Sequence, residues 1–600
     1  MIDDDVVGKA YDARLMRRLL GYLRPYRLHA SLALAAIIAN SMLQLAQPYL
    51  MKVAIDRFIP AGDLDGVNRI ALWYLAILAA AFCLEFIQTW LLQTTGQRIM
   101  FDMRLQIYRY LQRLDLRFYD RHPVGRVMTR VTTDVDVIND MFTSGVVSIF
   151  GDVFTLAGIM IVMLSMNWRL ALVAFAVLPL IVLITQWFRY RVRESYRTVR
   201  RLIARINAYL QEHITGMSTV QLFRREARAY DEFEKINQEH RTSNIESIFY
   251  YAVFYPAVDV VGALASALTI WYGGRSVLEG ALTLGSLVAF LLYSQRFFRP
   301  ISDMSEKFNI LQAAMASSER IFKLLDEPIA VANPAAPAPL PARPGGHIVF
   351  EHVWFAYNPA DGGEPDWVLK DVSFEVKPGE RVGIVGATGA GKSTLINLLL
   401  RFYDVTRGRI LVDSVDVREM DMHQLRALFS LVLQDVHLFS GTIAENIRLG
   451  NAGISDEAVS RAAAAVHADS FIARLPGGFA SPVAERGATL SVGQKQLLSF
   501  ARALAFNPRI LVLDEATSSI DTETEILIRD ALHVLMSGRT TIAIAHRLST
   551  IQDMDKILVL HKGHLRESGT HQELLAQRGI YFKLYQLQYK DQEARDPVHP

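Results

Sequence analysis

A glycine-rich loop in the carboxyl-terminal half carries the clearest chemistry of the chain. It reads Gly386-Ala387-Thr388-Gly389-Ala390-Gly391-Lys392-Ser393-Thr394, between a strand-like stretch, Arg381–Val385, and a helix-like stretch, Leu395–Leu400. This is the G-x-x-x-x-G-K-S pattern of a phosphate-binding loop. Its glycines leave backbone N–H groups open to phosphate oxygens, and the helix amino end favours negative charge. We expect Lys392 to contact the β- and γ-phosphates and the Ser393 hydroxyl to bind Mg²⁺.

A pair of acids ends an aliphatic stretch further along the chain, Ile510–Leu513. A continuous aliphatic run of this length is typical of a central strand in a parallel sheet. We expect Asp514 to hold Mg²⁺, directly or through water, and Glu515 to polarise the attacking water as a general base. A surface pair of acids is the competing interpretation, which the phosphate loop upstream disfavours. The sequence therefore predicts an α/β domain that binds a nucleotide together with Mg²⁺ and hydrolyses it.

The pentapeptide Leu490-Ser491-Val492-Gly493-Gln494 specifies the class of hydrolase. It resembles LSGGQ, the signature of ATP-binding cassette (ABC) proteins, with Val492 in place of the first glycine. In that family the signature contacts ATP held by another subunit. The resemblance therefore implies that Ser491, Gly493 and Gln494 complete the ATP site of a partner.

Residues 347–588 resemble a complete ABC nucleotide-binding domain, with the motifs of the family in the family's order. The resemblance implies that Tyr357 stacks on adenine and that Gln434 senses Mg²⁺ and contacts the membrane domain. It also places Asp521 in the D-loop and His546 against the γ-phosphate. Catalytic roles are implied for Glu515, His546 and Lys392, and Mg²⁺ contacts for Ser393, Gln434 and Asp514. The other implied nucleotide contacts come from the phosphate loop, at Gly386, Thr388, Gly389, Ala390, Gly391, Lys392, Ser393 and Thr394.

The amino-terminal half has the composition of a membrane domain. Of the 600 residues 51% are apolar, and six long apolar stretches precede about residue 305. Each approaches or exceeds the ~20 residues that cross a bilayer as a helix. Buried helices of a soluble protein are the competing interpretation, which six such stretches in one half disfavour. The stretches are 30–55, 69–94, 144–166, 168–188, 247–273 and 281–303.

Net charge and cysteine content exclude other classes. A net charge of +2 gives no electrostatic footprint for nucleic acid, so we expect no nucleic-acid partner. The single cysteine, Cys83, rules out an intramolecular disulfide framework and a cysteine zinc site.

The placement of Lys and Arg predicts the orientation in the membrane. The segment before the first stretch is basic, and so are 98–130 and 189–241, whereas the loops 56–68, 167–168 and 273–283 are short. We therefore expect both termini and the ATPase domain in the cytoplasm. Arg greatly exceeds Lys, as in GC-rich bacteria, so the expected location is a bacterial plasma membrane.

The expected fold class is an α-helical transmembrane domain of six spans with long cytoplasmic extensions, followed by an α/β P-loop ABC ATPase domain. Prolines and a Gly-Gly pair crowd the connection, which predicts an irregular linker. The expected domains are 1–327 for the transmembrane part with its coupling helices, 328–346 for the linker, 347–588 for the nucleotide-binding domain and 589–600 for a polar tail.

Six spans fused ahead of the ATPase resemble the B-type (multidrug and lipid) ABC exporter half-transporters over nearly the whole chain. Phe118–Arg126, with Arg130 and Asp134, resembles the first intracellular coupling segment of that family, and Ile214–Phe223 resembles the second. The resemblance implies that each segment docks on a nucleotide-binding domain and transmits its closure. Ordinary helix turns on a solvated face are the competing interpretation.

The resulting functional prediction is ATP-driven, multidrug-type export of amphipathic compounds by a dimer of half-transporters, made of two identical or two paralogous chains. The alternative is a lipid or lipopolysaccharide-precursor flippase of the same family. The fused domain order disfavours an importer. A hydrolysis-dead subunit is disfavoured because Lys392, Asp514, Glu515 and His546 all match the family.

Charged residues within the apolar stretches are candidates for substrate binding, because charges there are costly. Acids at Glu85, Asp152 and Asp259 suit a cationic aromatic compound, unless polar groups between helices pair with them. Arg296 and Arg299, near the cytoplasmic end of the sixth stretch, suit a lipid phosphate or serve as positive-inside anchors. Aromatic side chains that would assist are Trp90, Phe254, Tyr255 and Phe290.

Val492 leaves two interpretations open. A homodimer that tolerates the extra side chain is one. A heterodimer, in which this chain keeps Glu515 but lends an imperfect signature to a weaker second site, is the other.

Overall fold

The structure, a computed structural model, describes residues 12–341, 343–358, 365–514, 522–544 and 548–588. The chain divides into two compact units. The membrane unit comprises residues up to 112 and 123–327, and the nucleotide unit comprises 113–122 and the residues from 328 onward.

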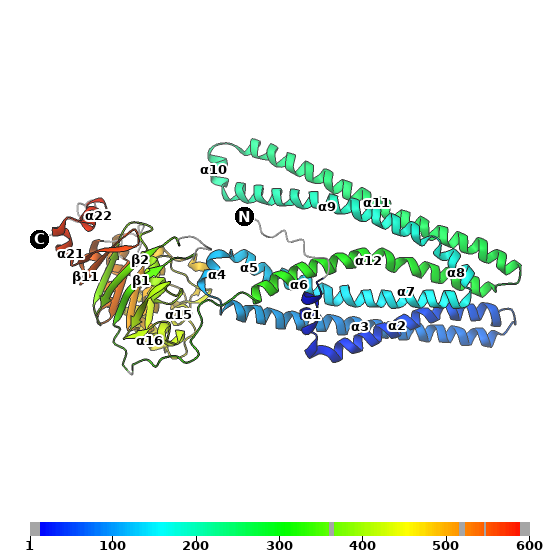
Figure 1. The fold of residues 1–600 in the computed structure, drawn as a ribbon, viewed down its shortest axis with the longest axis horizontal. Coiled ribbons are helices and arrows are strands. Elements are labelled where there is room, and N and C mark those ends of the chain that lie inside the picture. Colours follow the sequence, from blue (N-terminus) through cyan, green and yellow to red (C-terminus); the bar gives the residue numbers. More distant parts are fainter. Residues whose placement is uncertain (1–11, 342, 359–364, 515–521, 545–547, 589–600) are drawn as a thin grey trace. The chain divides into compact units, whose positions relative to one another are not determined.

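The described part of the membrane unit is helical throughout (Figure 1). Its long helices are α2 (Arg27–Val53), α3 (Leu64–Leu111), α7 (Val146–Met166), α9 (Leu178–Thr215), α11 (Glu226–Leu278) and α12 (Leu284–Leu325). Shorter helices are α1 (Ala13–Gly21), η1 (Arg24–Tyr26), η2 (Ala54–Phe58), α5 (Val124–Val131), α6 (Thr133–Asp140), η3 (Met141–Gly145), α8 (Trp168–Phe175) and α10 (Met217–Leu222).

Side-chain caps fix the short turns between these helices. Asp63 accepts a hydrogen bond from the Gly66 N–H at the start of α3. Asn167 does the same for α8 and Thr283 for α12. Each cap satisfies a backbone donor that the first helical turn leaves without a partner. The helices therefore begin sharply at the short loops between the predicted spans.

Five helical stretches are long and apolar enough to cross a membrane, judged by length and composition among the described residues. They are Arg24–Phe58, Leu64–Leu111, Val124–Met166, Trp168–Thr215 and Glu226–Leu278. The sixth predicted span, 281–303, overlaps the first part of α12 and stays a prediction. Several stretches far exceed ~20 residues, so their helices extend beyond a bilayer core.

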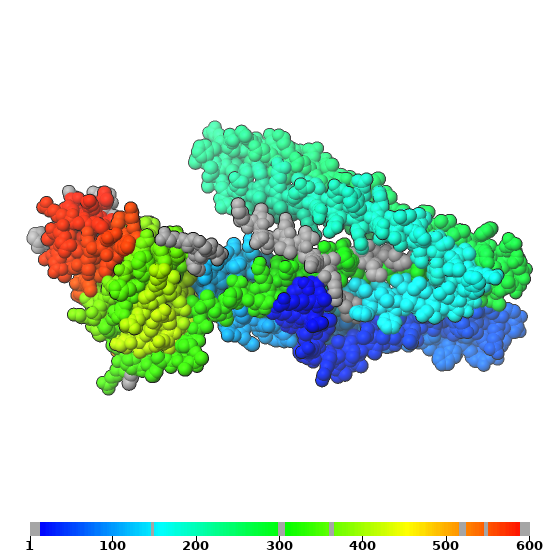
Figure 2. Space-filling model, in the orientation of Figure 1, coloured from blue at the N-terminus to red at the C-terminus, as the bar shows by residue number. Residues whose placement is uncertain are grey.

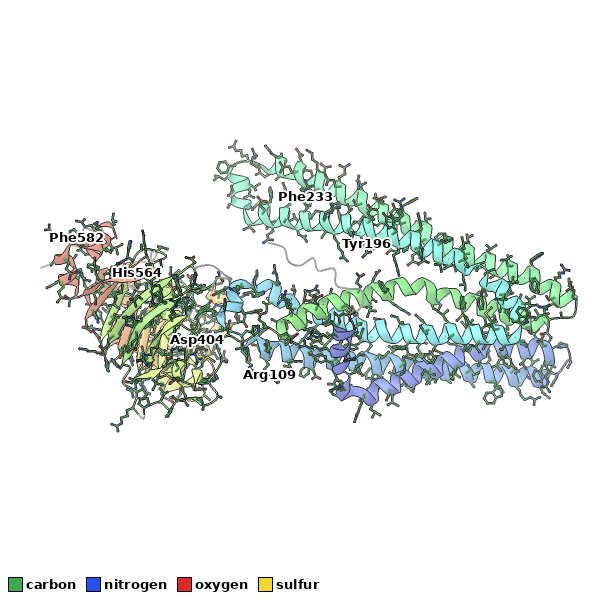
Figure 3. The ribbon with its side chains drawn as sticks, viewed as in Figure 1. Arg109, Tyr196, Phe233, Asp404, His564 and Phe582 are labelled. Carbon is green, nitrogen blue, oxygen red and sulfur yellow. The ribbon has the colours of Figure 1, made fainter. Side chains whose placement is uncertain are left out.

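Helices α9 and α11 pack along each other and form an arm of the membrane unit, with α10 at its tip (Figures 1 and 2). Tyr196 on α9 and Phe233 on α11 mark its two helices in Figure 3. Aromatic stacking joins them, with the Phe188 and Phe254 ring centroids 4.0 Å apart.

The nucleotide unit combines two main sheets with surrounding helices. One sheet has the order β2-β1-β4-β5 and is antiparallel. The other has the order β12-β11-β3-β10-β9-β6, in which every pair but β11–β12 is parallel. Its strands are β3 (Arg381–Val385), β6 (Phe429–Val432), β9 (Ile510–Asp514), β10 (Thr540–Ile544), β11 (Lys556–His561) and β12 (His564–Gly569).

The remaining elements of this unit complete both layers. The strands are β1 (Ile348–Phe355), β2 (Leu369–Val376), β4 (Arg407–Val412), β5 (Val415–Asp416), β7 (Gly441–Thr442) and β8 (Pro482–Val483). The helices are α4 (Leu116–Arg121), α13 (Lys392–Leu399), α14 (Met422–Ala427), α15 (Ile443–Arg448), α16 (Asp456–Ala465), α17 (Asp469–Ile472), η4 (Gly478–Ala480), η5 (Glu485–Gly487), α18 (Val492–Ala505), α19 (Thr522–Met536), α20 (Leu548–Gln552), α21 (His571–Gln577) and α22 (Ile580–Gln588).

Candidate nucleotide site and membrane residues

The parallel sheet gathers the predicted nucleotide residues at one edge. Strands β3, β10, β9 and β6 are consecutive neighbours and run in the same direction. The phosphate loop follows β3, Asp514 ends β9, and Gln434 lies just after β6. Because ligands bind at the carboxyl ends of parallel strands, this edge is the candidate site.

At two positions of the phosphate loop, a side chain larger than that of glycine would clash with its neighbours. A Cβ on Gly386 would lie 2.4 Å from the carbonyl oxygen of Leu560. Gly391 has a φ of 102°, and a Cβ there would lie 2.6 Å from the side chain of Leu369. Only glycine fits both positions without moving backbone or core, so the loop keeps its N–H groups accessible for phosphate.

Lys392 begins α13 and its side chain folds back over the loop. The Nζ donates to the carbonyl of Gly386 at 2.7 Å and to that of Ala387 at 3.2 Å. Burial lowers the pKa of Lys392, and the charge of Asp514 partly opposes this. These carbonyls hold the ammonium group where the phosphate loop would present phosphate to it.

The predicted magnesium ligands supply the oxygen donors that a hard cation prefers. Ser393 and Gln434 are exposed, and Asp514 is partly buried at the end of β9. These donors at the sheet edge fit Mg²⁺ bound together with nucleotide phosphates. Glu515, Asp521 and His546 lie outside the described residues, so their predicted roles stay predictions.

Tyr357 follows β1 and is held beside the phosphate loop. Its hydroxyl lies 3.1 Å from the Oγ1 of Thr394, the last residue of the loop. Its ring meets the ring of Phe355 edge-on, with centroids 4.9 Å apart. The ring is partly exposed. A planar base can therefore reach it from solvent.

The signature segment begins helix α18 with a reciprocal cap. The Oγ of Ser491 accepts from the Gln494 N–H, and the Oε1 of Gln494 accepts from the Ser491 N–H. This capping box leaves the hydroxyl proton of Ser491 able to donate outward. Gly493 is buried, whereas the side chain of Val492 is 57% exposed. Val492 therefore extends the surface beside Ser491 without disturbing the helix.

The first coupling segment contributes residues that the motif analysis did not assign to the nucleotide site. Its helix, α4, belongs to the nucleotide unit. The Tyr403 hydroxyl donates to the Asp120 carboxylate, and the Arg121 guanidinium donates to the side chain of Asn358. The residue type of Tyr403 gives no signal of this contact, because Asp120 lies 283 positions away in sequence.

The second coupling segment, with α10, forms the tip of the arm and exposes apolar side chains. Leu222 is 77% and Phe223 is 68% exposed. Apolar side chains grouped on a solvent-exposed tip are typical of a contact surface.

The charged candidates of the membrane unit fall into two groups. Asp152 forms an ion pair with Lys307, and both are largely buried. Arg296 donates to the carbonyl of Gln44 at 2.5 Å and to the Oε1 of Gln47 at 2.6 Å. By contrast, Glu85 and Asp259 are exposed. The side chain of Arg299 lies outside the described part.

The aromatic candidates also differ. Phe290 and Phe254 are 0% and 2% exposed, so both belong to the helix-packing core of the unit. We therefore withdraw these two as ligand contacts within a single chain. Trp90 and Tyr255 are 62% and 56% exposed.

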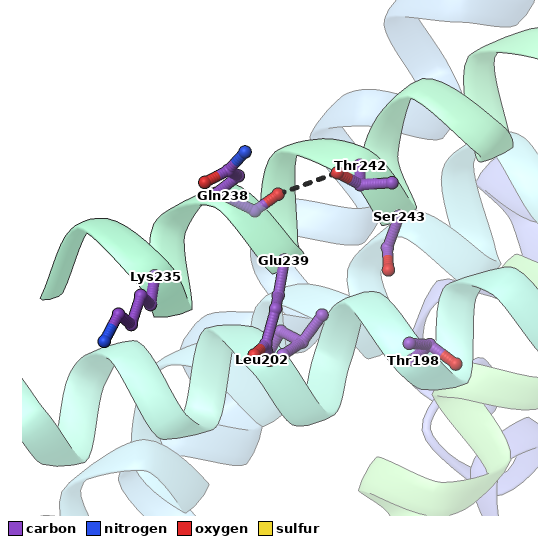
Figure 4. Close-up of a pocket in the computed structure, with 7 residues that line it drawn as sticks. All are labelled: Thr198, Leu202, Lys235, Gln238, Glu239, Thr242 and Ser243. Carbon is purple, nitrogen blue, oxygen red and sulfur yellow. Dashed lines mark hydrogen bonds between the residues drawn. The ribbon is translucent and has the colours of Figure 1, made fainter. Parts of the chain in front are cut away.

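A groove of about 540 Å³ lies between α9 and α11 (Figure 4). Its lining is polar apart from one leucine, and the Thr242 hydroxyl donates across one turn to the Gln238 carbonyl. The lining residues are Thr198, Leu202, Lys235, Gln238, Glu239, Thr242 and Ser243.

Comparisons with known proteins agree with this architecture. Residues 31–301 match the family model of the ABC transporter transmembrane region, and residues 369–518 match the family model described as ABC transporter. The solved structure of a bacterial Atm1-family ABC exporter with ATP bound superposes with a TM-score of 0.77. It is 31% identical and the match covers 96% of this chain and 99% of that one.

Two curated relatives extend the match. A probable multidrug resistance ABC transporter ATP-binding/permease protein, YheH of Bacillus subtilis, is 38% identical over 88% of this chain and 77% of its own length. An ATP-dependent lipid A-core flippase of Syntrophus aciditrophicus is 34% identical over 97% of this chain and 96% of its own. The chain belongs to the ABC transporter family. It is a multi-pass membrane exporter that couples ATP hydrolysis to transport.

Proposed function

We propose that this chain exports amphipathic compounds of the multidrug type as a dimer of half-transporters. The observation that carries the proposal is the convergence of the phosphate loop, Asp514 and Gln434 at one sheet edge, since the described residues contain one such edge and one membrane unit. By the family resemblance, the signature at Ser491 serves the ATP of a partner. A working pair of sites then needs two chains.

Within each site the residues divide the work. Bound Mg²⁺ would neutralise charge on the phosphates. When ATP binds, the Lys392 ammonium would exchange its hydrogen bonds to the Gly386 and Ala387 carbonyls for bonds to phosphate oxygens. Ser393, Asp514 and Gln434 would provide oxygen ligands for Mg²⁺. Glu515 orients the attacking water and accepts its proton, and His546 contacts the γ-phosphate. The Ser491 hydroxyl of the partner closes the site from the other side.

The membrane unit favours a cationic substrate over a lipid phosphate. Arg296 already donates to two groups of α2, whereas Glu85 and Asp259 are exposed on apolar helices. A carboxylate facing lipid is costly. The helix faces that carry Glu85 and Asp259 therefore suit a subunit contact or a water-filled path in the dimer. The name of the flippase relative supports the lipid alternative, which needs a phosphate site of its own. We place the ATPase domains in the cytoplasm of a bacterial inner membrane, following the distribution of Lys and Arg.

Two measurements test the proposal. Mass measurement of the complex in detergent should give two chains, identical or paralogous. In reconstituted vesicles, ATP hydrolysis should rise with cationic aromatic amphipaths and fall back in Asp259→Asn. Stimulation by lipid alone, unchanged in Asp259→Asn, would contradict the drug assignment and favour the flippase.

A further inference from the structure

Within the nucleotide unit, helix α4 bonds to the neighbour of Tyr357 and to Tyr403. The Tyr403 hydroxyl donates to Asp120, and Arg121 donates to Asn358, which is the neighbour of Tyr357 in sequence. One bond from the end of this short helix therefore reaches the segment that carries Tyr357, and the other reaches Tyr403.

Tyr403 connects this helix to Tyr357 through a ring contact. The Tyr403 ring meets the Tyr357 ring at 89°, with centroids 5.1 Å apart, and it also contacts the Phe355 ring. Perpendicular contacts of this kind are a favoured aromatic geometry. Tyr403 is only 6% exposed, so its ring has little room to move independently. The position of Tyr357 is set by the phosphate loop on one side and by Tyr403 on the other.

The start of α4 is anchored separately. The Asp115 carboxylate accepts a hydrogen bond from the Ala330 N–H at 2.9 Å, and Leu116 packs against the core beneath the sheet. The contacts at Asp120 and Arg121 can therefore strengthen or weaken without releasing the helix. An element held at one end and adjustable at the other is suited to transmit a small displacement.

The bond between Tyr403 and Asp120 has the chemistry of a firm link. Burial and the nearby Asp120 carboxylate raise the pKa of Tyr403, so the phenol stays protonated and donates to the carboxylate. A hydrogen bond to a charged acceptor is stronger than one between neutral groups.

We propose that Tyr403 is a positioning residue that transmits occupancy of the adenine face of Tyr357 to the first coupling segment through Asp120. The proposal rests on the adenine-stacking role of Tyr357 in the proposed function. In this arrangement the base, and not only the γ-phosphate, contributes to the signal that reaches α4.

Hydrogen–deuterium exchange on the full-length protein in lipid nanodiscs tests this relay. A non-hydrolysable ATP analogue should protect amides of both the phosphate loop and α4. In Tyr403→Phe and in Asp120→Ala, which remove the donor and the acceptor of this bond, the phosphate loop should stay protected, while α4 loses its nucleotide-dependent protection. Asp120 is exposed, so the second variant keeps the test valid if the first folds poorly. The corresponding cytidine analogue, whose smaller ring stacks less, should protect the loop and not α4 in the unaltered protein.

Tyr26→Phe is the matched control, because the Tyr26 hydroxyl donates to Asp102 at 2.7 Å in the membrane unit. It removes a bond of the same kind and should leave both protections intact. Full α4 protection in both Tyr403→Phe and Asp120→Ala would overturn the relay alone. Loss of α4 protection in Tyr26→Phe would overturn its specificity. An unprotected phosphate loop in the unaltered protein would overturn the proposed nucleotide site, and the relay with it.

Discussion

Arg296 donates to the carbonyl oxygen of Gln44, and that carbonyl is the one that Pro48 leaves without its helical partner. In an α-helix the N–H of residue 48 would bond the carbonyl of residue 44, and proline has no N–H. A carbonyl left unsatisfied within the hydrocarbon core of a bilayer is costly. The guanidinium on α12 therefore repairs the defect in α2 and joins the two helices. Tyr293 adds a second link, from its hydroxyl to the Leu45 carbonyl at 2.5 Å.

Arg296→Leu should destabilise the protein by about 1–3 kcal/mol, since it leaves the Gln44 carbonyl and the Gln47 side chain unsatisfied. Adding Pro48→Ala should recover part of this loss, because alanine restores the helical N–H. The apparent melting temperature in detergent measures both effects. Pro256→Ala, at the proline inside α11, is the matched control and should not rescue Arg296→Leu. Equal melting temperatures for the single variant and the Pro48→Ala double variant would refute the repair.

Asp152→Asn should destabilise the membrane unit because it leaves the ammonium of Lys307 largely buried without its carboxylate. Breaking such a pair costs about 3 kcal/mol, at the lower end of the range for buried pairs. The double variant Asp152→Asn, Lys307→Gln should recover stability, since no charge then stays buried. Drug-stimulated ATP hydrolysis distinguishes a structural role of Asp152 from a role in substrate binding. If the double variant recovers both its stability and its drug-stimulated hydrolysis, the pair is structural. Lost stimulation in a stable double variant would return Asp152 to the substrate site.

Local patterns predicted the parts of the fold that short-range physics determines. The strand expected over Arg381–Val385 is β3 with the same bounds, because a short aliphatic run before a glycine-rich turn fits few other structures. The helix after it begins earlier than expected, at Lys392, because the helix takes up the end of the phosphate loop. Apolar length likewise indicated the membrane-spanning helices.

Contacts between distant residues were beyond sequence reasoning. Arg296 suited a lipid phosphate by its charge, yet its acceptors lie about 250 positions earlier, with the Gln44 carbonyl 252 away. Asp152 suited a cationic substrate by the same reasoning and pairs with Lys307, 155 positions later. A single sequence contains the charge of each residue and its local neighbours. It does not contain the packing that brings a partner from another helix.

Glu515→Gln should stop turnover and leave ATP binding within about two-fold of the unaltered protein. The amide keeps the size of the side chain and removes its ability to accept a proton, and general-base catalysis typically contributes about 10²–10⁴ in rate. Phosphate release measures hydrolysis, and equilibrium binding of a fluorescent ATP analogue measures affinity. Glu457→Gln on the surface of α16 is the control and should hydrolyse ATP normally. Hydrolysis at the ordinary rate in Glu515→Gln would remove that residue from the proposed mechanism.

Val492→Gly should raise the rate of ATP hydrolysis if the chain forms a homodimer, because each signature then faces a site of the same kind. The Val492 side chain is 57% exposed beside Ser491, whose capping box does not depend on it. Its removal should therefore bring the Ser491 hydroxyl and the helix amino end closer to the phosphate of the partner. The change in folding stability should stay within about 0.5 kcal/mol, as for most exposed positions. Steady-state ATPase and ATP-dependent crosslinking of the two nucleotide domains measure the effect.

In a heterodimer the same change should strengthen only the second site, which two-site nucleotide binding would reveal as a selective gain in one affinity. An ATPase rate and binding curve unchanged by Val492→Gly would show that the extra side chain is simply tolerated.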